Sequence, residues 1–176
     1  MKLHPITEYH RIDVMSRVTS IRPQAQGGKT MQISMKCSVA VHCLIFIHEA
    51  EGVARVTSGL LAQSTGCNPV VIRGILSALK KGGIITVARG AGGARLCADP
   101  ACVTLYQIYK ALEPKGLCGL IGIHDCGGRA CPVARNIAAV LEKPYHKIEQ
   151  AVGQAMEEIT LQSMIEDFEQ RAGQAR

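Results

Sequence analysis

The 176-residue chain contains few aromatic residues: no Trp, four Tyr and two Phe. Proteins that bind single-stranded nucleic acid by stacking its bases use several aromatic side chains, so this mode of binding is not expected. The chain also lacks an apolar run of the roughly 18–20 residues that would cross a bilayer. Its longest run, 39–47, is interrupted by His42, and residues 1–30 contain no secretory hydrophobic segment. We therefore expect a cytoplasmic protein with no membrane partner.

Cysteine, in contrast, is abundant, with eight residues in the chain. Without an export signal, a disulfide framework is not expected, and clustered cysteines indicate metal or redox chemistry. Scattered cysteines are more often small buried hydrophobic residues. Apolar residues make up 47% of the chain, which is enough for a core and excludes wholesale disorder. The net charge of +6 is compatible with a polyanionic partner but does not by itself identify one.

Residues 1–30 differ from the rest of the chain. They hold five basic and two acidic residues, together with Pro5 and Pro23, and they show no sustained hydrophobic period. We expect a basic extension that is only partly ordered. The fold proper is expected to begin near Met31.

Residues 31–112 show the pattern of a winged helix-turn-helix domain. Thr57 or Ser58 can cap a short helix that ends at Gly66, and the pair Asn68-Pro69 is a typical start for the next helix, 69–81. The turn needs a small residue at the helix contact, which Ala62 supplies, and apolar residues that hold down the second helix. The β-prone segments 84–87 and 94–96 flank a glycine-rich turn, and this hairpin would form the wing. Thr104 is predicted to cap a further helix.

The charge distribution supports a DNA-binding role for this unit. Residues 52–100 contain six basic residues and one acidic residue, whereas 131–176 contain five basic and seven acidic residues. The alternative is an ordinary helical hairpin whose lysines are simply solvated. No nucleophile with a matching base and no phosphate-binding loop is apparent, because the glycines of 90–93 are better explained as a wing tip. We therefore do not expect an enzyme.

Helix 69–81 is the predicted recognition helix, and its first turn is expected to enter the major groove. Arg73 could form a two-pronged hydrogen bond to guanine, although a surface arginine paired with a neighbouring acid is the alternative. The glycine-rich wing tip with its flanking arginines is expected to approach the minor groove. The candidate DNA-binding residues are Asn68, Val70, Val71 and Arg73 near the bases, Thr57, Ser58 and Lys80 at phosphates, and Arg89 in the wing.

Residues 132–171 are predicted to form a long dimerisation helix. Apolar residues recur every three or four positions from Val133 to Ile159, almost four heptads, and Pro144 is expected to kink or split the helix. A small winged domain cannot cover such a stripe, so a second copy is its simplest partner, packed antiparallel or crossed. The alternative is that the helix folds back on its own domain. A symmetric dimer would bind a near-palindromic operator in double-stranded DNA.

Residues 113–131 form a cysteine- and glycine-rich loop that is predicted to act as a sensor. Cys118, Cys126 and Cys131 have the spacing C-x7-C-x4-C, and the glycines between them let backbone amides approach thiolate sulfurs. Three thiolates and one further ligand can hold an iron–sulfur cluster, with His124, Asp125 or a residue of a partner chain as the fourth. A zinc site and a metal-free thiol switch are the alternatives. The other five cysteines show no ligand spacing, and Cys43 and Cys67 are expected in the core.

These motifs together resemble the Rrf-two family of bacterial winged-helix regulators. The resemblance is carried by "TSGLLAQSTGCNPVVIRGILSALKKGGIITVARGAGGARL", "TLYQIYKALE", "CPVARNIAAVLE" and "QAMEEITL", and it covers nearly all of residues 31–170. It implies a homodimeric transcription regulator, usually a repressor, with the long helix exchanged between protomers. The combination of motifs is more specific than a helix-turn-helix alone.

The resemblance also bears on the cofactor. IscR-like, NsrR-like and RirA-like members hold an iron–sulfur cluster through three cysteines at this place, which implies Cys118, Cys126 and Cys131 as ligands of a [2Fe–2S] or [4Fe–4S] cluster. Such a cluster can be lost during preparation in air. Some NsrR-like members take another ligand from an aspartate in the first helix, but the matching residue here is Ser38. Other members lack a cluster and act through single thiols or small-molecule pockets.

The sequence thus predicts a mainly α fold, a winged helix-turn-helix with a small β-hairpin and a long C-terminal dimerisation helix. The predicted function is that of a DNA-binding regulator that senses iron, redox state or nitric oxide through its cluster. The alternatives are a cluster-free regulator of the same family and a metal-binding interaction protein without DNA function.

Overall fold

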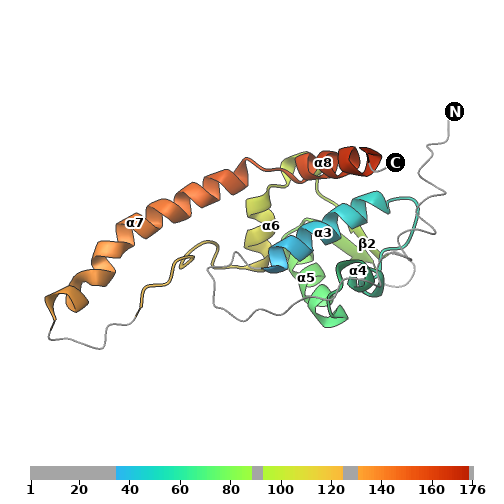
Figure 1. The fold of residues 1–176 in the computed structure, drawn as a ribbon. Helices are drawn as coiled ribbons and strands as arrows, with labels where there is room; N and C mark the ends of the chain where they lie inside the picture. The colour runs from blue at the N-terminus through green and yellow to red at the C-terminus, as the bar shows by residue number, and fades with distance from the viewer. Residues whose placement is uncertain (1–34, 89–92, 125–130, 175–176) are drawn as a thin grey trace.

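The computed structural model describes residues 35–88, 93–124 and 131–174, and the predicted extension 1–30 lies outside this range. These residues form a mainly helical fold with one small antiparallel hairpin, as expected from the sequence (Figure 1). The elements, in chain order, are α3 (Met35–Glu49), α4 (Ser58–Thr65), α5 (Pro69–Lys81), β1 (Ile85–Ala88), β2 (Gly93–Leu96), the 3-10 helix η1 (Pro100–Cys102), α6 (Leu105–Leu112), α7 (Pro132–Glu157) and α8 (Leu161–Gln174).

The core lies where α3, α5 and α6 meet, with the start of α8 packed against it. Helix α3 buries one face, which includes Cys43 and Leu44, and α6 adds Ile108. Helix α5 buries the four side chains at its 3.6-residue period, Ile72, Ile75, Leu76 and Leu79. Each such residue contributes about 1.5–3 kcal/mol relative to exposure, so the packing of α5 fixes its orientation.

The caps of the two central helices have the predicted geometry. The Thr57 hydroxyl accepts a hydrogen bond from Leu60 N at 3.2 Å, and Asn68 Oδ1 accepts one from Val70 N at 2.8 Å. Between them, Gly66 adopts φ 69°, a left-handed conformation that strains residues with a Cβ atom. The chain therefore turns between α4 and α5 at the position that the sequence indicates.

The wing is attached to the loop before α4 by close backbone contact. Strands β1 and β2 pair with Ile85 opposite Leu96 and Ala88 opposite Gly93. Ala94 N donates to Val56 O at 3.0 Å. Gly93 has φ +69°, and a Cβ atom there would lie 2.7 Å from Val56 O. Only glycine fits both the conformation and the space. The wing tip, 89–92, lies outside the described residues.

The predicted long helix is divided, and the expectation of one helix over 132–171 is wrong. Helix α7 ends at Glu157 and α8 begins at Leu161. The break lies where Leu105 N donates to Ile159 O at 2.8 Å and Leu161 N donates to Val103 O at 2.7 Å. These bonds, between segments far apart in sequence, pull the backbone out of the helix at Thr160, whose hydroxyl then accepts from Ser163 N in the first turn of α8. Pro144 lies inside α7 and does not split it.

Helix α7 extends away from the body of the protein (Figure 1). Met156 at its C-terminal end is its one buried residue, whereas Val133, Val140 and Ile148 are 68%, 62% and 43% exposed. The helix therefore leaves apolar residues from Val133 to Ile148 outside its own domain, whereas Val152, near the end of the predicted stripe, packs against the core. None of the described helices has the length and apolarity of a membrane span.

One acidic side chain joins α7 to the cysteine loop. Glu149 Oε1 accepts hydrogen bonds from Gly119 N at 2.7 Å and from Leu120 N at 3.2 Å. The Glu149 side chain is only 16% exposed, and its second carboxylate oxygen lies 3.9 Å from His146 Nδ1. Gly119 has φ +77°, which turns its amide toward the helix. The loop beside Cys118 is thus fastened to α7 through these backbone hydrogen bonds as well as through the buried Leu117 side chain, which lies against Gly153 of α7.

We expect Glu149→Ala to release this loop while the winged domain stays folded. Hydrogen bonds to a carboxylate contribute about 1.5–3 kcal/mol, so amide exchange at Gly119 and Leu120 should accelerate at least tenfold. Hydrogen exchange followed by NMR measures both amides directly. Glu142→Ala, on the exposed surface of the same helix, is the matched control and should leave both rates unchanged. Equal rates in the two variants would show that the Glu149 bonds do not hold the loop.

Candidate nucleic-acid interface and cysteine loop

The first turns of α5 present four of the predicted residues to solvent. Asn68 and Arg73 are exposed, and Val70 and Val71 are 64% and 44% exposed. The buried residues of α5 lie on its other face, so these side chains project outward from a fixed helix. The helix N-terminus carries a partial positive charge from its unpaired amides, which favours an anionic partner.

The predicted phosphate contacts fall into two places. Thr57, the N-cap of α4, is exposed, and Ser58, the first residue of α4, is half-buried. Both lie close to the predicted recognition helix in the fold, because α4 packs against α5. Lys80 lies ten residues after Val70, roughly 15 Å along the helix axis at 1.5 Å per residue. It is exposed, with Lys81, at the opposite end of α5. The structure therefore does not bring Lys80 into the group at the N-terminus of α5.

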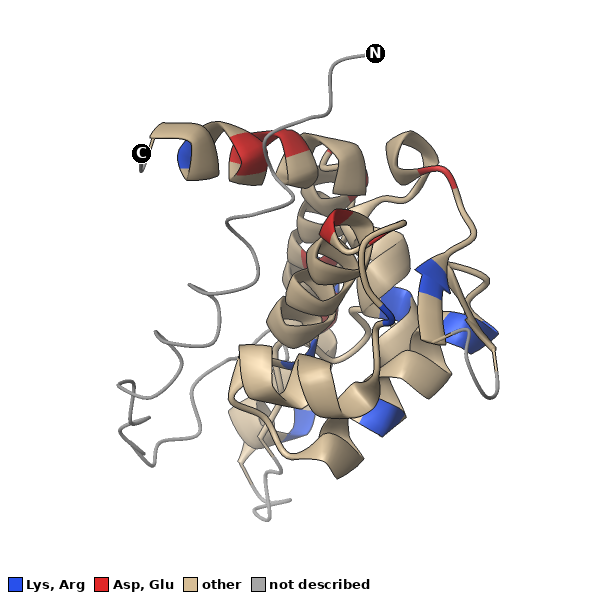
Figure 2. Ribbon diagram, turned by 90° about the vertical axis from the view of Figure 1, so that its right-hand side faces the viewer, with Lys and Arg blue, Asp and Glu red and all other residues tan. Residues whose placement is uncertain are grey.

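The wing adds a basic residue outside the predicted set. Arg95 is exposed on β2, opposite Thr86 of β1, while the predicted wing residue Arg89 lies outside the described residues. In the view of Figure 2, Lys and Arg lie mainly in the lower half, over the winged unit, whereas Asp and Glu lie mainly in the upper half, which includes α8. The described structure thus separates a basic winged unit from an acidic C-terminal helix.

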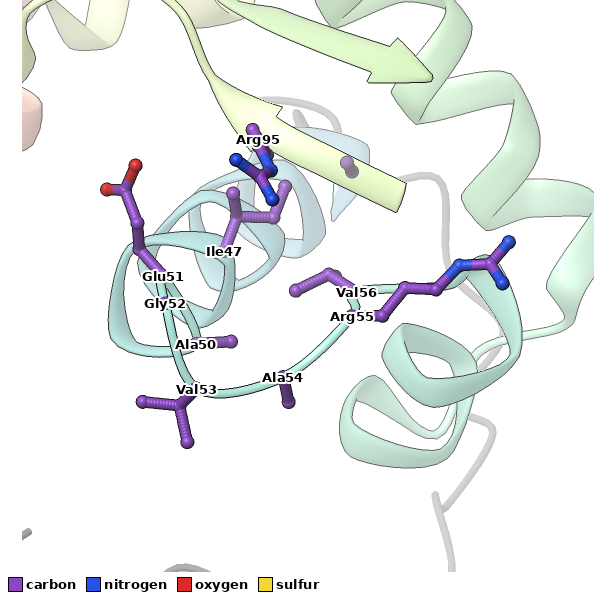
Figure 3. A pocket seen from close by; sticks show the side chains of 10 residues that line it. Ile47, Ala50, Glu51, Gly52, Val53, Ala54, Arg55, Val56 and Arg95 are labelled. Carbon is purple, nitrogen blue, oxygen red and sulfur yellow. The ribbon is translucent and has the colours of Figure 1, made fainter. Parts of the chain in front are cut away.

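A small cavity of about 260 Å³ lies between the loop 50–56 and β2 (Figure 3). Arg95 extends over it, whereas the Arg55 side chain points away toward α4. Pockets for drug-sized ligands span about 300–1,000 Å³, so this cavity suits at most a very small molecule. A larger open hollow of about 580 Å³ lies between Tyr109 and the cysteine loop, where Glu113, Cys118 and Gly119 line it. The predicted small-molecule alternative therefore has two candidate places among the described residues, and the one beside Cys118 has the volume of a ligand pocket.

The described cysteines of the loop are accessible. Cys118 and Cys131 are both exposed free thiols. Cys131 is the N-cap residue of α7, and its side chain makes no capping hydrogen bond to the helix. Gly116 and Gly119 both adopt positive φ beside Cys118, so the backbone can approach a ligand of that sulfur. Two exposed thiols on a glycine-rich turn fit the ligand chemistry of an iron–sulfur cluster or of zinc.

The remaining predicted ligands are less fully described. Cys126 and Asp125 lie outside the described residues, and His124 is exposed at the end of the described part of the loop. Ser38, the position of the additional ligand in some relatives, is exposed on α3. The assembly of the three-cysteine set therefore stays a prediction.

The cysteines of the core have a different character. Cys43 is fully buried, as expected, and Cys37 of the same helix is also buried, while Cys67 is half-buried. Burial, with a smaller contribution from Cys67, raises the pKa of Cys43 to about 12, and burial also raises the pKa of Cys37. Because the thiolate is the reactive form, these two thiols are inert near neutral pH. A thiol switch would have to use the exposed cysteines.

Sequence reasoning did not identify Glu149. It lies thirty residues from Gly119 in the chain, and an acidic residue on a helical surface carries no local signal of such a contact. Arg95 flanks the predicted wing tip together with Arg89, so the charge pattern already points to it although the candidate set names Arg89 alone.

Comparison with known proteins gives a consistent result. The profile of the Rrf2 (Rrf-two) family, described as "Iron-dependent Transcriptional regulator", matches residues 33–167. The chain is 32% identical over 120 residues to the "Putative HTH-type transcriptional regulator YwnA" of Bacillus subtilis (strain 168), a match that covers 68% of this chain and 86% of YwnA.

Solved structures share the fold. A "putative transcriptional regulator" from Lactobacillus plantarum is 28% identical with a TM-score of 0.65, over 81% of this chain and 99% of that protein. IscR of T. potens is 20% identical with a TM-score of 0.59, over 82% of this chain and 93% of IscR. At that identity, IscR supports the fold alone. With its winged helix and its match over residues 33–167, the chain belongs to the Rrf2 family of DNA-binding transcriptional regulators.

Proposed function

We propose that this protein is a homodimeric repressor that reads a near-palindromic operator through α5. The observation that carries the proposal is the exposure of Asn68, Val70, Val71 and Arg73 on the first turns of a helix whose other face is buried. Apolar side chains that are exposed to this extent at a helix N-terminus contribute nothing to packing. Contact with DNA would give them a partner.

Each of these side chains matches a feature of the major groove. The Arg73 guanidinium can donate two hydrogen bonds to the O6 and N7 of a guanine, and the valine methyl groups can contact thymine methyls. Asn68 uses Oδ1 to cap α5, so its amide nitrogen can still donate to a base or a phosphate. Thr57, Ser58, Lys80 and Arg89 are assigned to the DNA backbone and the wing contact, with Arg95 added on β2.

The dimer would form along α7. Its exposed apolar residues, among them Val133, Val140 and Ile148, extend along a helix that projects from the body (Figure 1). An isologous contact between two such helices would cover them and set the spacing of two copies of α5. Two recognition helices related by a twofold axis read two half-sites about one or two helical turns apart.

The sensing function is assigned to the loop 113–131. Cys118, Cys126 and Cys131 would hold an iron–sulfur cluster, whose chemistry supplies sensitivity to iron supply, oxidation or nitric oxide. The chain's own contribution is mechanical: Glu149 ties the loop to α7, so a change in loop order acts directly on the dimer helix. The exposed thiols of Cys118 and Cys131 favour a second candidate, a cluster-free thiol switch in the same loop.

We expect Arg73→Ala to weaken operator binding and to relax its sequence preference. Loss of a two-pronged contact to guanine costs about 1–3 kcal/mol, or roughly 5- to 150-fold in affinity. The operator is first selected with the wild-type protein from a random duplex pool, and binding is then measured by fluorescence anisotropy at several salt concentrations. Arg171→Ala on α8 removes the same charge and should retain affinity and preference. If the two variants had the same affinity and the same sequence preference, Arg73 would not contact a base.

We expect Val140→Glu to separate the dimer. A charge within an apolar helix contact should raise the dissociation constant at least tenfold, because the carboxylate would be buried without a partner. Ala139→Glu is the matched control, because this exposed position lies about 160–180° around the helix axis from Ile137 and Ile148 and so places the same charge on the side opposite the apolar stripe. Sedimentation velocity at several concentrations measures both. A monomeric wild type, or equal effects of the two variants, would contradict assembly through this face.

We expect the wild-type protein to contain iron and sulfide after anaerobic purification, and Cys118→Ser and Cys131→Ser to lose most of both. Removal of one thiolate from a three-cysteine set leaves the cluster without a required ligand. Cys97→Ser and Cys102→Ser, which remove exposed thiols outside the loop, should retain wild-type content. Elemental analysis and the visible absorption spectrum provide the readout. A colourless wild type without iron would leave the thiol switch as the function of the loop.

A further inference from the structure

A second group of metal-ligating side chains lies away from the cysteine loop. His48 and Glu49, the last two residues of α3, and Glu169 of α8 each offer one ligand atom, and these atoms lie within 4.8 Å of one another. The residues come from helices that pack together although they are far apart in the chain. The fold therefore brings one imidazole and two carboxylates together on the side of the protein where α8 covers α3.

The polar atoms of this group are not satisfied by other side chains. His48 Nδ1 is buried and has no hydrogen-bond partner among the described residues. Within the same residues, no lysine or arginine forms an ion pair with Glu49 or Glu169. A buried imidazole nitrogen without a partner and two neighbouring carboxylates without a counter-charge both favour a bound cation.

We propose that His48, Glu49 and Glu169 bind a first-row divalent cation. One imidazole and two carboxylates are donors that ions from Mn²⁺ to Zn²⁺ accept, and three protein ligands leave positions for water. Ligands bonded at about 2.1 Å lie about 3–3.5 Å apart, so the exposed Glu169 side chain needs only to swing inward. The C-terminal end of α3 adds the partial negative charge of its carbonyl groups, which favours a cation at the same place.

The site would fasten the C-terminal helix to the winged domain. The side chains of Leu161 and Ile165 are buried and hold the first turns of α8 against the domain, whereas the residues from Glu166 to Gln174 are exposed. Glu169 lies in this outer half, so a cation shared with α3 supplies an attachment where apolar packing is missing. The proposal is independent of the DNA-binding function and of the cysteine loop, because it uses nitrogen and oxygen donors rather than thiolates.

Titration of the full-length protein with Mn²⁺, followed by EPR of the unbound ion, tests this site. Mn²⁺ is the preferred probe because it binds carboxylate and imidazole donors but competes poorly for thiolates. We expect one Mn²⁺ per chain, displaced by Zn²⁺ in keeping with the general order of affinities. We also expect paramagnetic broadening of amide signals at the end of α3 and in the outer half of α8.

Glu169→Gln is the main variant, because this exposed side chain can be replaced without disturbing the core. It should weaken Mn²⁺ binding at least tenfold, and His48→Gln should do the same if the variant folds. Glu166→Gln, on the same helix outside the group, is the matched control and should bind as the wild type does. The proposal fails if the wild type binds no Mn²⁺ at millimolar concentration. It also fails if Glu169→Gln and Glu166→Gln bind equally, or if the broadening maps to another region.

Discussion

The burial of one face of α5 is the constraint on which the rest of the molecule depends. Ile72, Ile75, Leu76 and Leu79 contribute about 1.5–3 kcal/mol each by leaving water, and together they fix both the axis and the rotation of the helix. Because the rotation is fixed, the side chains between them must face solvent. Arg73 and the two exposed valines are thus available for the proposed contact with DNA without contributing to the packing of the fold.

The local parts of this fold could be predicted from the sequence, and the non-local parts could not. The caps at Thr57 and Asn68 involve hydrogen bonds over two or three residues, so residue identity and spacing determine them. The break between α7 and α8 arises from hydrogen bonds with residues 103–105, more than fifty positions away. The apolar period of the sequence continues up to this break, so nothing in the local pattern indicates that the helix ends there. Glu149 was missed for the same reason, since its partners are backbone amides in another segment.

The exposed apolar stripe of α7 has no partner within the described chain. Its side chains gain no burial from their own domain, and large exposed apolar patches on soluble proteins commonly mark contact surfaces. The Thr160 break makes this projection possible. It anchors the end of α7 against α6 by backbone pairing and lets α8 turn back onto α3, so the stripe on α7 stays available to a second copy.

The same connection links the cysteine loop to α5, the proposed recognition helix, through a short series of contacts. Glu149 joins the loop to α7, α7 packs on α6, and α6 packs on α5, where a Cβ at Gly82 would lie 3.0 Å from the Ala111 methyl group. Spatial contiguity alone does not establish coupling, because a signal also requires an element with two stable arrangements. The packed helices are poor candidates for that element, since close-packed cores resist gradual deformation. The loop, held to α7 by one carboxylate and by Leu117, is the part of this path that a change at a cysteine could reorganise most easily.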